Sequence, residues 1–205
     1  MAELVTDGDR RSIQTPSLRL SFRWTGDRWA HAIEVRRPGV PDPVAVVRTI
    51  EGDPDRDDPA RVVSPAYQQL EFQEGGTGLR ALLVGQSGPH HFSAVFAVEE
   101  GPDRVDIGVD VADRCRAPIE ALACTYLVEA TSGDLIDADP ASIRWAIAPG
   151  RLTLDPTAPS HVQLSEGGRR ATRAQAIAAL APGVQTHRCV YHWRWTPAPE
   201  LRTLI

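Results

Sequence analysis

Two histidines, a serine and two aspartates lie close together in predicted strands near the middle of the chain: His90, His91, Ser93, Asp110 and Asp113. A histidine oriented by a carboxylate is a general base, and a serine beside it is a nucleophile, so these residue types could support hydrolysis. Histidines with carboxylates could also hold a metal ion. The alternative interpretation is a solvated strand face, because the sequence contains no G-x-S-x-G motif that would present a nucleophile on a turn.

Carboxylates alternate along a second segment, at Asp53, Asp55 and Asp57. Calcium is bound by several oxygens from one short loop, and this spacing resembles the start of such a loop. The pattern then departs from an EF-hand, because Asp58 stands where glycine is needed and Ser64 where the bidentate glutamate belongs. We therefore expect an acidic loop in solvent, with no resident metal or cofactor.

Four of the five tryptophans belong to a predicted hairpin near the start of the chain and to the last predicted strand. If those strands were neighbours, their aromatic side chains would form one cluster that could grip a sugar or another flat ligand. The alternative is that the same rings pack in the core. The residues of this predicted ligand-binding cluster are Trp24, Trp29, His31, Tyr191, Trp193 and Trp195.

The composition excludes several kinds of chemistry. The chain of 205 residues has no lysine and no asparagine, and all 22 of its basic residues are arginines. A Schiff base, lysine-anchored pyridoxal phosphate and a P-loop are therefore excluded, as is N-glycosylation. The net charge of −5 and the lack of a basic block argue against nucleic acid as the main partner.

Cysteine usage and hydropathy predict a cytoplasmic protein. Cys115, Cys124 and Cys189 show no CxxC spacing, which argues against a structural zinc site. No apolar run reaches the ~20 residues that span a bilayer, so we expect no membrane insertion. The polar segment from Met1 to Gln14 lacks the apolar region of a signal peptide, and we expect residues 1–14 to be poorly ordered.

The clearest predicted element is a hairpin formed by residues 18–24 and 29–35. Apolar and polar residues alternate in both segments, which is typical of half-buried strands. Gly26 suits the first central position of a type II′ turn. This turn predicts a register in which Trp24 lies opposite Trp29 and Arg19 lies opposite Glu34.

A second hairpin is predicted around Gly101 and Pro102. Alternation in residues 92–98 and 105–111 suggests that Val98 lies opposite Val105 and Phe92 opposite Val111. In that register His91 and Asp110 are diagonal neighbours on the outer face, and Ser93 lies directly opposite Asp110.

Further strands are predicted throughout the chain, at residues 44–50, 67–72, 79–85, 121–129, 143–147, 151–154, 161–164 and 184–195. One helix is predicted over residues 171–180, which are rich in alanine and end before Pro182-Gly183. Many short strands separated by Gly/Pro turns predict one antiparallel β-sandwich domain over residues 1–205. A closed or partly open barrel and a truncated supersandwich, the architecture of sugar mutarotases, are the alternatives, although mutarotase motifs are absent.

These observations favour a non-enzymatic module that binds a small molecule, such as a carbohydrate, or a protein partner. A second hypothesis is an enzyme of mutarotase or hydrolase type acting on a carbohydrate or small metabolite, with His90 or His91 as general base and Asp110 or Asp113 orienting it. A third is a structural domain that associates with a copy of itself as a homodimer.

Overall fold

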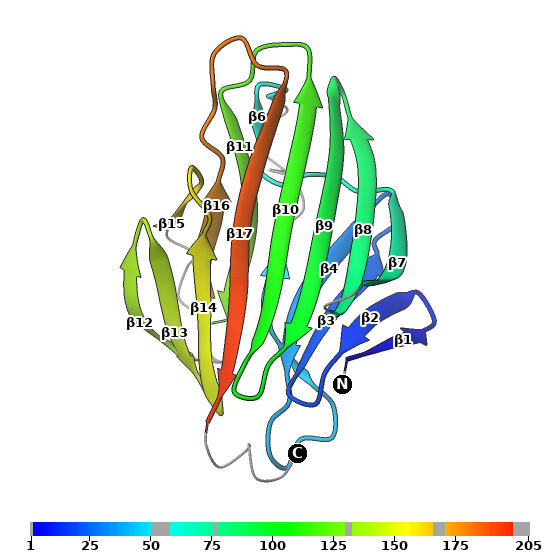
Figure 1. The fold of residues 1–205 in the computed structure, drawn as a ribbon, viewed down its shortest axis with the longest axis vertical. Coiled ribbons are helices and arrows are strands. Elements are labelled where there is room, and N and C mark those ends of the chain that lie inside the picture. The colour runs from blue at the N-terminus through cyan, green and yellow to red at the C-terminus, as the bar shows by residue number, and fades with distance from the viewer. Residues whose placement is uncertain (1, 51–57, 76–77, 130–132, 166–170, 199–205) are drawn as a thin grey trace.

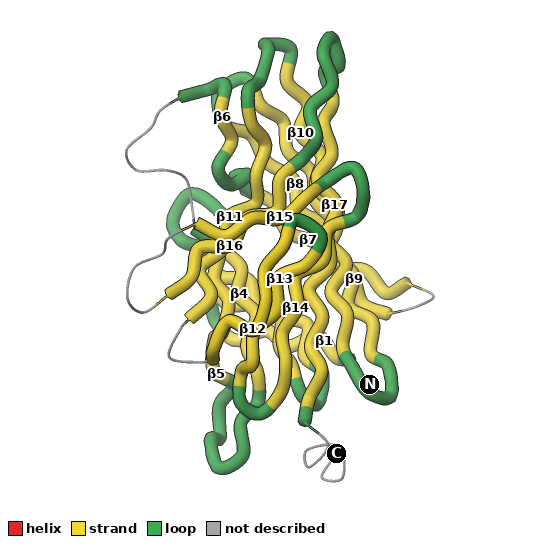
Figure 2. Tube along the Cα trace, turned by 90° about the vertical axis from the view of Figure 1, so that its left-hand side faces the viewer, coloured by secondary structure: helices red, strands yellow, loops and turns green. Residues whose placement is uncertain are grey.

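The computed structural model describes residues 2–50, 58–75, 78–129, 133–165 and 171–198, and within these ranges the chain is all β. Two antiparallel sheets pack face to face and do not close into a barrel, so the predicted β-sandwich is confirmed (Figure 1). Figure 2, turned by a quarter, shows strands and loops and no helix along the described chain. No helix that could cross a membrane therefore occurs in these ranges.

The first sheet has nine strands in the described residues. Its order is β1 (Glu3–Asp7), β2 (Arg10–Gln14), β3 (Leu18–Trp24), β4 (Trp29–Val35), β5 (Val44–Thr49), β11 (Ala121–Glu129), β16 (Ala171–Ile177) and β15 (His161–Ser165). The short strand β6 (Arg61–Val62) pairs in parallel with β11.

The second sheet faces the viewer in Figure 1, with eight strands in the described chain. Its order is β12 (Gly133–Asp139), β13 (Ser142–Ile147), β14 (Gly150–Pro156), β17 (Thr186–Pro197), β10 (Val105–Cys115), β9 (His90–Glu100), β8 (Gly78–Ser87) and β7 (Gln69–Gly75). Strand β17 thus lies between two groups of strands that are consecutive in the sequence.

The β3–β4 hairpin has the predicted register throughout. Trp24 lies opposite Trp29, and Arg19 lies opposite Glu34. The Thr25 N–H donates to the Arg28 carbonyl over 2.9 Å. Gly26 has a φ of 106°, a backbone conformation that residues other than glycine rarely adopt. The alternating apolar residues of both strands face the core, as expected for a sheet with one buried face.

The β9–β10 hairpin exists, but its predicted register is wrong by two residues. Val98 lies opposite Ile107 instead of Val105, and Phe92 lies opposite Asp113. The cause is a tighter turn than expected, in which the Gly101 N–H donates to the Arg104 carbonyl over 2.8 Å.

Two expectations about secondary structure are corrected. The predicted helix over residues 171–180 is instead strand β16, which pairs with β11 on one side and β15 on the other. Because Ala174 and Ala176 are fully buried on its inner face, packing between the sheets outweighs the helix propensity of alanine. Residues 1–14, expected to be poorly ordered, contain the paired strands β1 and β2.

The core is one cluster of apolar side chains from the facing surfaces of both sheets. Its largest fully buried members are aromatic, and they come mainly from β11, β13 and β17. They are Trp145, Trp193, Trp195, Tyr126 and Tyr191. Burial of this aromatic surface, together with the aliphatic residues around it, stabilises the packing of the two sheets.

Candidate functional site

The structure separates the predicted aromatic cluster into a surface pair and a buried group. Trp24 is 36% exposed at the β3–β4 turn, and Trp29 is half-buried beside it with their ring centroids 5.6 Å apart. The guanidinium of Arg11 lies 5.4 Å from the ring centroid of Trp29. The two indoles meet edge to face at 64°, so they form no flat platform for a ligand.

The other four residues of the cluster, His31, Tyr191, Trp193 and Trp195, are buried between the sheets. These four residues therefore pack in the core, as in the alternative interpretation of the aromatic cluster.

A chain of polar groups runs through this part of the core. His31 Nε2 lies 3.1 Å from the Tyr126 hydroxyl, which hydrogen-bonds to the Tyr191 hydroxyl of the opposite sheet. Burial lowers the pKa of His31 to about 3, so its imidazole is neutral. Burial likewise raises the pKa of both tyrosines. A cavity of about 10 Å³ next to these groups is too small for any organic ligand.

His90 and Asp113 form a buried pair at one end of the sandwich. His90 Nδ1 lies 2.8 Å from Asp113 Oδ2, and His90 Nε2 donates to the Pro59 carbonyl over 2.6 Å. With both ring nitrogens engaged and the side chains at most 5% exposed, His90 holds the Pro59 segment against the core.

His91 and Asp110 lie on the outer face, as predicted, but they are not neighbours. Arg114 is the residue opposite His91, and Val95 is opposite Asp110. His91 and Asp110 are therefore separated by roughly 13 Å along the strands. Asp110 instead forms an ion pair with Arg188 of β17.

The predicted serine contact is also absent from the hairpin. Ser93 lies opposite Ala112, not Asp110. The arrangement of His91, Ser93 and Asp110 expected from the sequence is therefore not formed, because its geometry depended on the register that the structure corrects. The alternative pair, His90 with Asp113, is formed but buried.

The metal candidates Asp53, Asp55 and Asp57 lie outside the described residues. Within the described ranges, no three histidine, cysteine or acidic side chains are grouped so that they could hold a metal ion.

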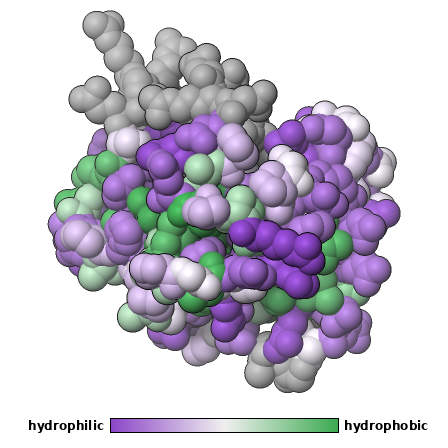
Figure 3. Space-filling view, turned by 90° about the horizontal axis from the view of Figure 1, so that it is seen from above, coloured by the Kyte–Doolittle hydropathy of each residue, from purple (hydrophilic) through white to green (hydrophobic). Residues whose placement is uncertain are grey.

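An open hollow of about 550 Å³ lies where β9 begins and β10 ends, and it is lined by Pro89, His91, Arg114 and Arg116. In the part of the chain that the structure describes, neither guanidinium forms an ion pair or a hydrogen bond. Figure 3 looks down on this end of the sandwich and shows strongly hydrophilic side chains beside smaller apolar areas. Two uncompensated arginines and a histidine around one hollow are suited to an anionic group.

A second hollow, of about 360 Å³, adjoins the first and shares His91. Its other lining residues are amides and apolar groups from β7, β8, β9 and the segment before β7: Gln68, Gln69, Val84, Gly85, Gln86 and Phe92.

One wall of this second hollow depends on a glycine. A Cβ on Gly85 would come within 2.0 Å of the Ala66 carbonyl oxygen, so only glycine lets this segment lie against β8. Gln68 is held in turn by the Gln86 N–H, which donates to its side-chain oxygen over 2.7 Å.

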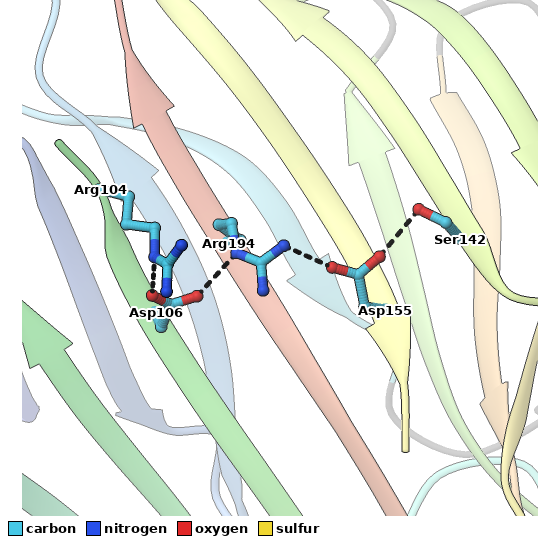
Figure 4. Close-up of polar contacts among 5 residues, drawn as sticks. All are labelled: Arg104, Asp106, Ser142, Asp155 and Arg194. Carbon is cyan, nitrogen blue, oxygen red and sulfur yellow. Dashed lines mark hydrogen bonds and ion pairs between the residues drawn. The ribbon is translucent and has the colours of Figure 1, made fainter. Parts of the chain in front are cut away.

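Elsewhere on this sheet face, one group of charged side chains forms a paired network. Arg194 of β17 donates to Asp106 over 2.9 Å and to Asp155 over 3.0 Å (Figure 4). Arg104 and Ser142 extend the network at its two ends. Arg114 and Arg116 differ from Arg194 because they form no ion pair in the described residues, and they line one hollow together with His91.

The sequence interpretation included His91 but missed Arg114, Arg116 and the glutamines. The available signal was the turn at residues 101–104, which sets the register and brings Arg114 opposite His91. Glutamine and arginine at strand ends carry no other pattern that would distinguish them from ordinary surface residues.

No protein-family model matches the chain, and no curated protein matches it. Among solved structures, a 4-alpha-glucanotransferase from Thermococcus litoralis is similar over 96% of this chain and 39% of that chain. The TM-score is 0.49 and the sequence identity is 8%. The chain spans about two fifths of that protein's length, and a likeness this distant indicates no function.

Proposed function

We propose that this chain is a non-enzymatic binding module. Its ligand places an anionic group in the larger hollow, which is lined by Arg114, Arg116 and His91. The observation that carries the proposal is the pair Arg114 and Arg116, which line one hollow with His91 and have no counter-charge among the described residues. Arginine recognises carboxylate, phosphate and sulfate through paired N–H donors, so any of these groups fits the hollow.

Binding is a better proposal than catalysis for this site. A general base needs a partner that orients it, and His91 has no carboxylate opposite or diagonal to it in the observed register. Among the described residues the histidine–aspartate ion pair is His90 with Asp113, which is buried and has both ring nitrogens engaged. Substrate therefore has no access to it.

Thermal unfolding in the presence of simple anions tests the proposal. An anion at about ten times its Kd stabilises the folded state by about 1.4 kcal/mol, which raises the melting temperature. We expect phosphate, sulfate or galacturonate to produce such a shift in the natural chain. The double variant Arg114→Gln/Arg116→Gln should lose it.

The matched control is Arg80→Gln/Arg151→Gln, which removes the same charge at two exposed positions away from the hollow. This control should keep the shift. The proposal fails if no anion shifts the natural chain, or if both double variants respond alike.

A further inference from the structure

The two hollows are joined by a row of side chains across three strands. Gln86 of β8 lies opposite His91 of β9, and His91 lies opposite Arg114 of β10. All three are exposed on the outer face. Adjacent strands are about 4.8 Å apart, so the row extends over roughly 10 Å between Gln86 and Arg114, which is longer than one monosaccharide ring.

The chemistry changes along this row. At the β10 end Arg114 and Arg116 offer positive charge and donors only. At the β8 end the amides of Gln69 and Gln86 offer both donors and acceptors beside the apolar surface of Val84, which is 44% exposed. A ligand that fits both ends has an anionic group at one end and hydroxyl groups on a compact carbon frame at the other.

An extended peptide is a poorer fit to the same surface. Strands β8, β9 and β10 are each hydrogen-bonded to a neighbour on both sides. At the row, β10 is paired with β17 at Arg114, and the Gln86 N–H already donates to the Gln68 side chain, so the backbone offers little edge for an added peptide strand. Recognition must come from side chains, and the amide groups match the hydroxyl pairs of a sugar.

We infer that the ligand is an acidic oligosaccharide, which lies across β8–β10 with a carboxylate at Arg114 and Arg116 and neutral hydroxyls at Gln69 and Gln86. The inference rests on the proposed function, because it requires the anion site, and it adds the second hollow and the substrate class. Inorganic anions and single sugar acids occupy only the arginine end.

Calorimetric titration with galacturonic acid and with its trimer tests this inference. We expect the trimer to bind about tenfold more tightly than the monomer, a difference of about 1.4 kcal/mol. Neutral maltotriose, triglutamate and a short single-stranded oligonucleotide serve as comparison ligands. Each should bind more weakly than the galacturonate trimer.

Two sets of variants separate the two ends of the row. Gln69→Ala/Gln86→Ala should weaken trimer binding three- to tenfold and leave the monomer unchanged, whereas Arg114→Gln/Arg116→Gln should abolish both. Gln73→Ala is the matched control, since Gln73 is exposed four residues further along the same strand as Gln69. It should bind both ligands as the natural chain does.

The failures of the two proposals are distinguishable. If the natural chain binds no anion, both the anion site and the oligosaccharide proposal are overturned. Three outcomes would overturn the oligosaccharide proposal and leave the anion site intact. They are equal affinity for monomer and trimer, glutamine variants that bind the trimer as the natural chain does, and triglutamate that binds as tightly as the galacturonate trimer.

Discussion

The hydroxyl groups of Tyr126 and Tyr191 hydrogen-bond to each other across the interior of the sandwich and so connect β11 of one sheet with β17 of the other. Tyr126 is the middle member of the chain of polar groups, because His31 also contacts its hydroxyl. Both tyrosines are at most 1% exposed, so no solvent replaces a lost partner.

Tyr126→Phe should therefore destabilise the fold more than Tyr191→Phe. Removing the Tyr126 hydroxyl leaves two buried polar groups without their bond, with an expected loss of about 1–3 kcal/mol, against about 1 kcal/mol for Tyr191→Phe. Urea denaturation of both variants and of the double variant measures this. The double variant should lose less than the sum of the two singles. The reverse order for the single variants would contradict the central position of Tyr126.

A second prediction concerns the pH dependence of stability at His31. Burial lowers the folded-state pKa of His31 to about 3, whereas an unfolded histidine has a pKa of about 6.5. Between these values the unfolded chain binds a proton that the folded chain does not. The contribution of a neutral His31 to the free energy of unfolding is thus complete above about pH 6.5. It decreases by about 1.4 kcal/mol for each pH unit as the pH falls toward 3.

The comparison variant for this measurement is His31→Gln, which keeps a polar contact to Tyr126 and does not titrate. The difference in free energy of unfolding between the natural chain and this variant should shrink as the pH is lowered from 7 to 5. A difference that stays constant over this range would show that His31 is protonated in the folded state.

Asp113 and Asp110 offer a matched test of buried and exposed charge on one strand. Asp113 is fully buried against His90, whereas Asp110 pairs with Arg188 on the outer face. Asp113→Ala should cost about 3 kcal/mol or more, because it leaves His90 buried without its partner. Asp110→Ala should cost less than about 1 kcal/mol. Similar losses in chemical denaturation would contradict the inward orientation of Asp113.

The Arg194 network should make a small contribution that depends on salt. Its partners Asp106 and Asp155 are about one quarter exposed or less, while Arg194 is 37% exposed, so solvent screens the interaction. Arg194→Gln should lower stability by about 1 kcal/mol or less, with a smaller effect at high salt. Arg151→Gln, at an exposed position, should show no such dependence. Melting temperatures at low and high ionic strength measure both.

The two hairpins show which parts of a β fold can be predicted from sequence. In β3–β4 a turn centred on Gly26 allows one register, and the structure has that register. In β9–β10 a shift of two residues keeps Val98 and Val105 on the inner face, so hydrophobic alternation fits both registers equally. Only the backbone hydrogen bond between Gly101 and Arg104 distinguishes them.

The same ambiguity limited what could be predicted of the site. In the expected register Ala112 would lie opposite His91, whereas the structure places Arg114 there. The arginine hollow could not be recognised without that correction. Similarly, alanines at 174 and 176 favour a helix in isolation, and only the facing sheet explains why they form a strand.

The position of β17 has a consequence for synthesis of the protein. Residues 186–197 fill the gap between β10 and β14, so both of those strands keep an unpaired edge until this late segment has left the ribosome. Unpaired edges are templates for association with other chains. A nascent or truncated chain that stops short of residue 186 would present two such edges, and it should therefore aggregate more readily than a chain that includes β17.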